Sequence, residues 1–137
     1  MSARTKARKA ALDLLFEADQ RGVNVSELLG QRQATPAGEA PVRDFTADLV
    51  RGTVEHWTAI NDLITTWSQG WTLERMPAVD RAILRLGTYE VVYAVGAPET
   101  VAISEWVGLA TDLSTDESPK FVNGILGRLL ELKPTLV

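Results

Sequence analysis

The sequence contains no cysteine and one histidine, His56. The lack of cysteine excludes disulfide frameworks, thiolate nucleophiles and cysteine-based zinc sites. A single histidine with no cysteine or second histidine is a poor metal ligand and a poor member of a catalytic triad. We therefore expect no metal centre.

Motifs that hold phosphates or activate nucleophiles are also missing, because there is no glycine-rich phosphate loop and no nucleophile elbow. The acids Asp112, Asp116 and Glu117 lie near each other, but in a polar stretch, whereas paired catalytic carboxylates need one that is buried. We expect no catalytic residue, no cofactor and no enzymatic activity.

Long apolar runs are absent too, and none approaches the roughly 18 residues that a membrane span requires. Asp13, Glu17 and Asp19 interrupt the apolar residues that follow the basic N-terminus, so no signal-peptide core forms. The expectation is a cytoplasmic protein without a membrane partner.

Positive charge is scarce except at the N-terminus. Residues 1–9 contain Arg4, Lys6, Arg8 and Lys9 and no acid, whereas residues 10–137 hold ten cations against 18 acids. An acidic bulk repels nucleic acid, so any binding of that kind must be local. The basic stretch is either a solubilising tail, a phosphate-binding arm or a membrane-surface helix. The last of these fits less well, because core packing would leave little of the flanking apolar face for a membrane.

Apolar periodicity predicts an all-α protein of about seven helices with no β alternation. We expect a single domain over residues 1–137, with an N-terminal half at 4–69 and a C-terminal half at 71–133, packed around a central helix. The predicted helices span 4–21, 26–33, 44–69 with a break near Trp57, 77–95, 101–113, and the region from 118 onward. Trp71 and Leu73 are expected to fill the junction between the halves.

The central helix, residues 77–95, is apolar on most sides and should pack against several neighbours. Arg81 and Arg85 share one face of it, and Glu90 lies within its apolar run. These charges form either a solvated edge or the lip of a binding surface.

The segment SPKFVNG, residues 118–124, begins with a helix cap followed by proline. Lys120 could reach a phosphate, Phe121 could stack on a base and Asn123 could read a base edge. Alternatively, Phe121 belongs to the core and Asn123 lies near a cap. Gly124 and Gly127 are expected to allow close approach of a neighbouring backbone.

Three stretches together resemble the NusB family of bacterial transcription factors. They are ARKAALDLLFEAD near the N-terminus, AVDRAILRLGTYE in the central helix and SPKFVNGILG near the end, with VAISE between the last two. The resemblance implies an all-α fold of two three-helix halves. It also implies a role in antitermination, in which the protein binds boxA RNA of nascent ribosomal transcripts as a heterodimer with NusE, a ribosomal small-subunit protein. That pair helps to hold the RNA to the elongating RNA polymerase, and some members form homodimers that cover the RNA site.

Carried over by position, the resemblance implies one RNA surface assembled from both ends of the chain. It would comprise residues of the N-terminal basic segment and of the start of the last helix, and residues of the central helix would border the RNA or the partner. The first group is Arg4, Lys6, Arg8, Lys9, Glu117, Lys120, Phe121 and Asn123, and the bordering group is Arg81, Arg85 and Glu90. The chain departs from the family at Trp106, Gly108 and Thr111, and an exposed Trp106 would enlarge the apolar surface.

Two other functions fit the sequence less well. NusB-like domains accompany some RNA cytosine methyltransferases, and this chain has neither the cofactor loop nor the cysteine of such enzymes. A helical interaction module that binds no nucleic acid is the remaining alternative, with the basic stretch serving solubility alone.

Overall fold

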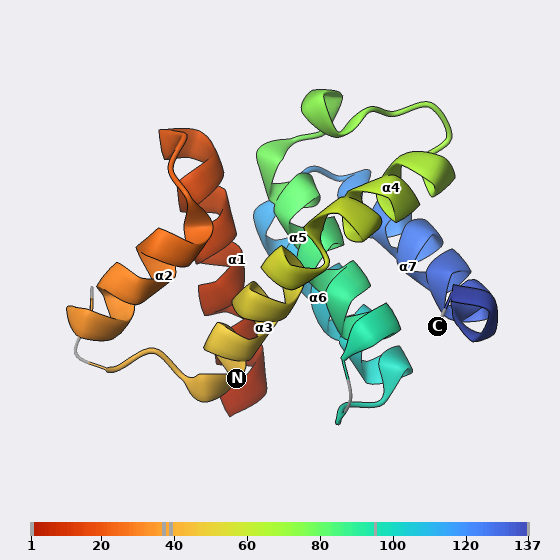
Figure 1. Ribbon diagram of the computed structural model, residues 1–137. Helices are drawn as coiled ribbons and strands as arrows, with labels where there is room; N and C mark the ends of the chain where they lie inside the picture. The colour runs from red at the N-terminus through yellow and green to blue at the C-terminus, as the bar shows by residue number, and fades with distance from the viewer. Residues whose placement is uncertain (1, 37, 39, 95, 137) are drawn as a thin grey trace.

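The computed structural model describes residues 2–36, 38, 40–94 and 96–136, and these contain helices and turns but no strand. Figure 1 shows the helices gathered around α5. The predicted all-α fold is thereby confirmed. The elements are α1 (Ala3–Arg21), α2 (Val25–Ala34), α3 (Asp44–Glu55), α4 (Trp57–Trp67), η1 (Leu73–Arg75), α5 (Ala78–Thr88), η2 (Tyr89–Tyr93), α6 (Glu99–Leu113) and α7 (Ser118–Leu136).

Local capping explains where the first helices begin and end. The Ser2 hydroxyl accepts a hydrogen bond from the Thr5 amide (3.0 Å), and α1 stops at Gly22, whose φ of 65° is in the left-handed region. Asn24 caps α2, which begins one residue before the predicted start at residue 26, because the Asn24 side-chain oxygen accepts from the Ser26 and Glu27 amides. Ser26 itself lies in the first turn.

Helix α5 forms the centre of the fold and packs against α1, α3, α4, α6 and α7. The predicted regular helix instead changes to a π turn at η2, where the Ala94 amide donates to the Tyr89 carbonyl (3.0 Å). Val95, the last residue predicted for this helix, lies outside the described residues. Among the described helices, none is long and apolar enough to cross a membrane.

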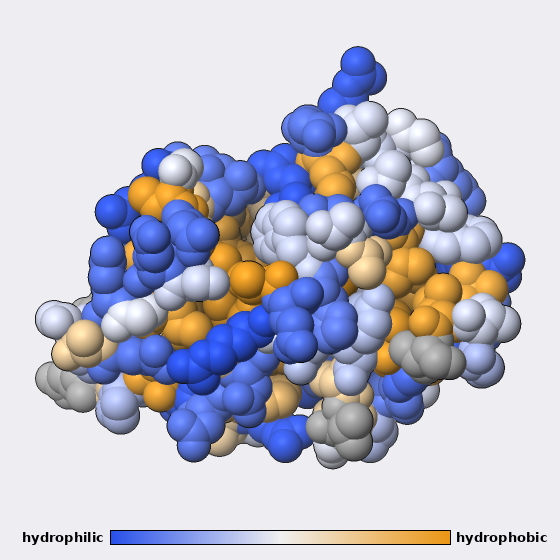
Figure 2. Space-filling model, viewed as in Figure 1, coloured by the Kyte–Doolittle hydropathy of each residue, from blue (hydrophilic) through white to orange (hydrophobic). Residues whose placement is uncertain are grey.

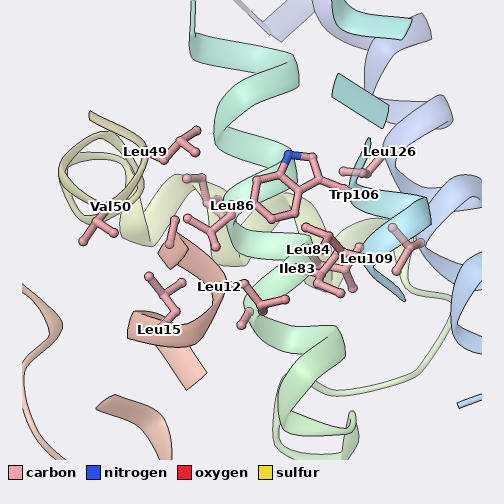
Figure 3. Close-up of a cluster of buried hydrophobic side chains, with 14 of the residues drawn as sticks. Leu12, Leu15, Leu49, Val50, Ile83, Leu84, Leu86, Trp106, Leu109 and Leu126 are labelled. Atoms are coloured by element: carbon pink, nitrogen blue, oxygen red, sulfur yellow. The ribbon is translucent and has the colours of Figure 1, made fainter. Parts of the chain in front are cut away.

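The core is built from leucine, isoleucine and valine side chains of all the α-helices, and Trp106 lies within it (Figure 3). Trp106 is fully buried, so this departure from the family pattern does not enlarge the apolar surface. The reason is that Trp106 points inward from α6 between residues such as Leu86 and Leu126, as Figure 3 shows. Trp71, which was expected to fill a junction, is instead 52% exposed, whereas Leu73 packs against the core.

Close helix approach depends on other glycines than those expected. A Cβ at Gly124 or Gly127 would meet nothing within 4 Å, whereas one at Gly87 would lie 2.9 Å from the Leu126 side chain. One at Gly52 would overlap the Tyr89 ring. Contacts between α3 and η2, and between α5 and α7, therefore require these two glycines.

Replacing Gly52 with alanine should destabilise the protein by about 1–3 kcal/mol, because the added methyl overpacks the contact with Tyr89. Gly108→Ala is the matched control, since Gly108 is exposed in α6 with open space at its Cβ position. There, alanine should be stabilising by up to about 1 kcal/mol through helix propensity. Urea denaturation of both variants measures the difference, and equal stability of the two would contradict the assigned contact.

Candidate nucleic-acid interface

The four N-terminal cations have different environments at the start of α1. Arg4 and Lys6 are exposed, and neither forms an ion pair with any residue that the structure describes. The Arg4 guanidinium lies over the Phe45 ring, 4.5 Å from its centroid, which fixes the side chain without neutralising its charge. Lys9 is partly exposed and pairs with Asp13 one turn later (2.9 Å). Two free cations therefore remain at this end of α1.

Arg8 is buried and forms an ion pair with Glu90 of η2. Its Nε and Nη2 donate to the two Glu90 carboxylate oxygens (2.9 and 2.6 Å), and its Nη1 donates to Glu105 of α6 (3.1 Å). Burial by itself lowers the pKa of the Arg8 guanidinium, but the hydrogen bonds and charges of Glu90 and Glu105 outweigh burial and leave the pKa above its ordinary value. Glu90 also accepts from the Trp106 indole N–H (2.9 Å).

These contacts correct two expectations. Arg8 and Glu90 are 2% and 4% exposed, so Arg8 does not present its charge to RNA and Glu90 does not lie at an edge that RNA or a partner could contact. Instead, the pair joins the start of α1 to the end of the central helix. Because Arg8 also binds Glu105 and Glu90 also binds Trp106, both of α6, the pair positions the start of α1 relative to α6.

Arg81 and Arg85 are half-buried and bind groups within the chain. Arg81 pairs with Asp19 (2.7 Å) and donates to the Leu73 and Met76 carbonyls, which fixes the connector before α5. Arg85 donates to Asn61 (2.9 Å) and lies 4.3 Å from the Trp57 ring centroid. Burial lowers the pKa of Arg85 from its ordinary value. Contact of either arginine with RNA or a partner stays a prediction.

The start of α7 is attached to the start of α5 by buried hydroxyls. Ser118 Oγ donates to Asp80 (2.9 Å), and Ser114 Oγ donates to the other oxygen of the same carboxylate (2.5 Å). The helix begins at Ser118 as predicted, but the Ser118 hydroxyl connects two helices as well as accepting from the Thr115 amide. Asp80, the acid at this junction, is therefore satisfied by hydrogen bonds.

The side chains that follow Ser118 lie at the surface. Glu117, Lys120 and Asn123 are exposed, and Phe121 is half-buried with its ring 5.5 Å from that of Trp71. A cavity of about 750 Å³ lies beside them, lined in part by Trp67, Trp71, Phe121 and Arg128. The Arg128 guanidinium lies 4.9 Å from the Trp67 ring centroid.

Sequence reasoning missed Trp67, Trp71 and Arg128 as members of this surface. The signal that could have indicated them is the pair of tryptophans on either side of Gly70 in a polar connector. A second cavity, of about 510 Å³, is lined by residues of α1, α2, α3, α4 and α5. On the face shown in Figure 2, apolar residues gather in a hollow between α2 and α3, and further apolar residues lie on the right-hand side of the view.

The two predicted parts of the RNA surface lie at opposite ends of α5. We call Arg4 and Lys6 the cationic zone, and Trp71, Lys120 and Phe121 the aromatic zone. The first is attached to Glu90 through Arg8, and the second to Asp80 through Ser118, so about 15 Å of helix rise separates the two attachment points. In Figure 1 the N-terminus lies near the bottom of the molecule, and α7 starts at the level of the upper end of α5. The predicted RNA surface would therefore comprise two zones, and contact of one strand with both stays a prediction.

Comparison with known proteins agrees with this architecture. The sequence profile of the NusB family matches residues 5–131. The transcription antitermination protein NusB of Beutenbergia cavernae is 54% identical over 144 residues, which cover 99% of this chain and 94% of that protein. The NusB structure of T. maritima has a TM-score of 0.82 at 32% identity and covers 95% of this chain and 92% of that one. A crystal structure of the antitermination factors NusB and NusE in complex with dsRNA has a TM-score of 0.79 at 26% identity, over 93% of this chain and 96% of that one.

Proposed function

The chain belongs to the NusB family of transcription antitermination factors, and on that premise we propose that it binds single-stranded boxA RNA of nascent ribosomal transcripts together with NusE. The similarity to a NusB in complex with NusE and dsRNA supports NusE and RNA as partners. The proposed role is that of an adaptor in the cytoplasm, which reaches the elongating RNA polymerase indirectly. It requires no chemical step by this chain.

The observation that carries the proposal is the exposure of Arg4 and Lys6 on an otherwise acidic chain. Among the described residues neither has an acidic partner, and Arg4 is held in place by Phe45. Cations without partners on a fixed helix end can neutralise phosphates and release their counterions. The first contact with RNA is therefore electrostatic.

The attachment points of the two zones, Glu90 and Asp80, are separated by about 15 Å of helix rise, and we take this as the approximate span of a strand that contacts both zones. At about 3.4 Å for each nucleotide of a stacked strand, this distance corresponds to roughly five nucleotides. A boxA segment a few nucleotides longer than this would place phosphates at the cationic zone and bases at the aromatic zone. The RNA strand would then pass near Glu117, Lys9 and Asn123, which would not be its main contacts.

Replacing Arg4 and Lys6 together with alanine should weaken RNA binding and flatten its salt dependence. Two lost phosphate contacts should reduce the slope of log K against log salt by about 1.4 for a single strand. Fluorescence anisotropy with labelled boxA RNA, with and without NusE at several salt concentrations, measures this change.

Arg21→Ala combined with Arg51→Ala serves as the control, because it removes the same charge from exposed positions elsewhere on α1 and α3. The control should leave the slope nearly unchanged. If both double variants lost the same amount of slope, the salt dependence of RNA binding would reflect the net charge of the protein and not contacts by Arg4 and Lys6. An absence of RNA binding by the unaltered protein, even with NusE, would instead favour a helical interaction module that does not bind RNA.

A further inference from the structure

Trp71 is the most exposed of the large apolar side chains that the structure describes, at 52%. It lies in the connector between α4 and η1, where its backbone is held firmly. Ser68, which is buried, donates its hydroxyl proton to the Trp71 carbonyl (2.6 Å), and the Trp71 amide donates to the Ser68 carbonyl (3.3 Å). The exposed indole therefore extends from a fixed turn rather than from a loose loop.

The turn that presents Trp71 adopts an unfavourable backbone conformation. Gln69 has a φ of 55°, the only positive φ of a non-glycine residue in the described part of the chain, and Gly70 follows with a φ of 91°. Residues with a Cβ adopt this region at an energetic cost, and such strain concentrates at ligand-binding positions. The positive φ angles at Gln69 and Gly70 thus lie directly before the exposed Trp71.

The Trp71 ring contacts Phe121 without being covered by it. The two ring centroids are 5.5 Å apart and the planes are inclined by 47°, so the contact is tilted rather than stacked. Phe121 therefore orients the indole and leaves ring surface exposed. The cavity beside the pair, about 750 Å³, lies within the range of roughly 300–1,000 Å³ that is usual for small-molecule sites.

Charges around this cavity suit a nucleotide better than an apolar ligand. Lys120 is exposed next to Phe121, and Arg128, which forms an exposed ion pair with Glu131 (3.1 Å), lines the cavity near Trp67. Two acids line the cavity: Asp80 accepts hydrogen bonds from the Ser114 and Ser118 hydroxyls, whereas Glu117 is exposed at its edge. Exposed aromatic rings beside cations are the means by which proteins bind single-stranded nucleic acids.

We propose that Trp71 is the stacking platform for one unpaired RNA base, with Phe121 as the side wall of the site and Lys120 at the adjoining phosphate. This inference rests on the proposed RNA-binding function and adds a residue and a position to it. Stacking does not release counterions, so the contribution of Trp71 to binding is independent of salt, in contrast to that of Arg4 and Lys6.

The test compares Trp71→Ala and Trp71→Phe with the unaltered protein, by anisotropy with boxA RNA at several salt concentrations. Trp71→Ala should bind about 10- to 100-fold more weakly at every salt concentration, with an unchanged slope, because it loses one base stack. Trp71→Phe should retain part of the affinity. Phe16→Ala, which removes another exposed ring from α1, should bind RNA alone as tightly as the unaltered protein.

A second measurement locates the base. RNAs that carry a single abasic position, moved stepwise along boxA, should include one position that weakens binding by the unaltered protein but causes no further loss with Trp71→Ala. Binding by Trp71→Ala equal to that of the unaltered protein would overturn the stacking role and leave the proposed function intact. Failure of the unaltered protein to bind RNA would overturn the proposed function itself.

Discussion

Removing either member of the buried Arg8–Glu90 pair should destabilise the protein by about 3–5 kcal/mol, because the remaining charge is left buried without its partner. The pair is bidentate, and each side chain is 2% exposed. Glu105 cannot substitute for Glu90, since it is 29% exposed and contacts only one nitrogen of Arg8. The expected loss is a large part of the roughly 5–15 kcal/mol that stabilises a typical domain.

Urea denaturation of Arg8→Met, Glu90→Leu and the double variant measures this loss. The double variant should be more stable than the sum of the single losses predicts, because apolar side chains of similar volume leave no unpaired charge. Arg21→Met is the control, as the Arg21–Glu17 pair is exposed and should contribute about 0–1 kcal/mol. Single variants no less stable than this control would contradict the buried pair.

Replacing Trp106 with alanine should lower the unfolding free energy by about 3–5 kcal/mol, through the cavity it leaves in the core. Trp106 is fully buried and donates its indole proton to Glu90. Trp106→Phe keeps most of the packing but loses this hydrogen bond, so it should cost about 1–3 kcal/mol.

Val101→Ala is the control for the Trp106 variants, because Val101 is 48% exposed on the same helix and should change stability by at most about 0.5 kcal/mol. Thermal or urea unfolding of the three variants gives their order of stability, in which Val101→Ala should be the most stable and Trp106→Ala the least stable. If Trp106→Ala unfolded at the same urea concentration as Val101→Ala, the buried position of the indole would be wrong.

Helix boundaries could be predicted from the sequence because their signals are local. Gly22 ends α1, the break near Trp57 separates α3 from α4, and Ser118 begins α7, all as expected. Each depends on residues within one or two turns, which periodicity and capping rules describe. The change to a π turn at η2 carried no such local signal.

The candidate site was harder to predict because its charges are paired across the chain. Arg8 and Lys6 look alike in the sequence, and Glu90, which distinguishes them by burying Arg8, lies 82 residues further along. The same holds for Trp106, whose burial depends on α5 and α7. Composition therefore located the basic segment but could not show which of its cations have an acidic partner in the fold.

The exposure of the aromatic side chains could not be predicted from the sequence either. Trp71 and Phe121 lie 50 residues apart, and their contact depends on the turn at Gln69 and on the hydroxyl bonds between Ser118 and Asp80. An apolar side chain in a connector is more often buried than presented. The expectation that Trp71 fills a junction followed from this tendency and was wrong for that reason.

The account depends on one strand of RNA contacting both ends of α5. Photo-crosslinking tests this most directly, with boxA RNAs that carry a single 4-thiouridine at successive positions, in the presence of NusE, followed by identification of the crosslinked peptides. Nucleotides toward one end of boxA should crosslink to the peptide that contains Arg4 and Lys6, and nucleotides toward the other end should crosslink to peptides that contain Trp71 or Phe121. Crosslinks confined to one of these zones, or located on neither, would contradict the account.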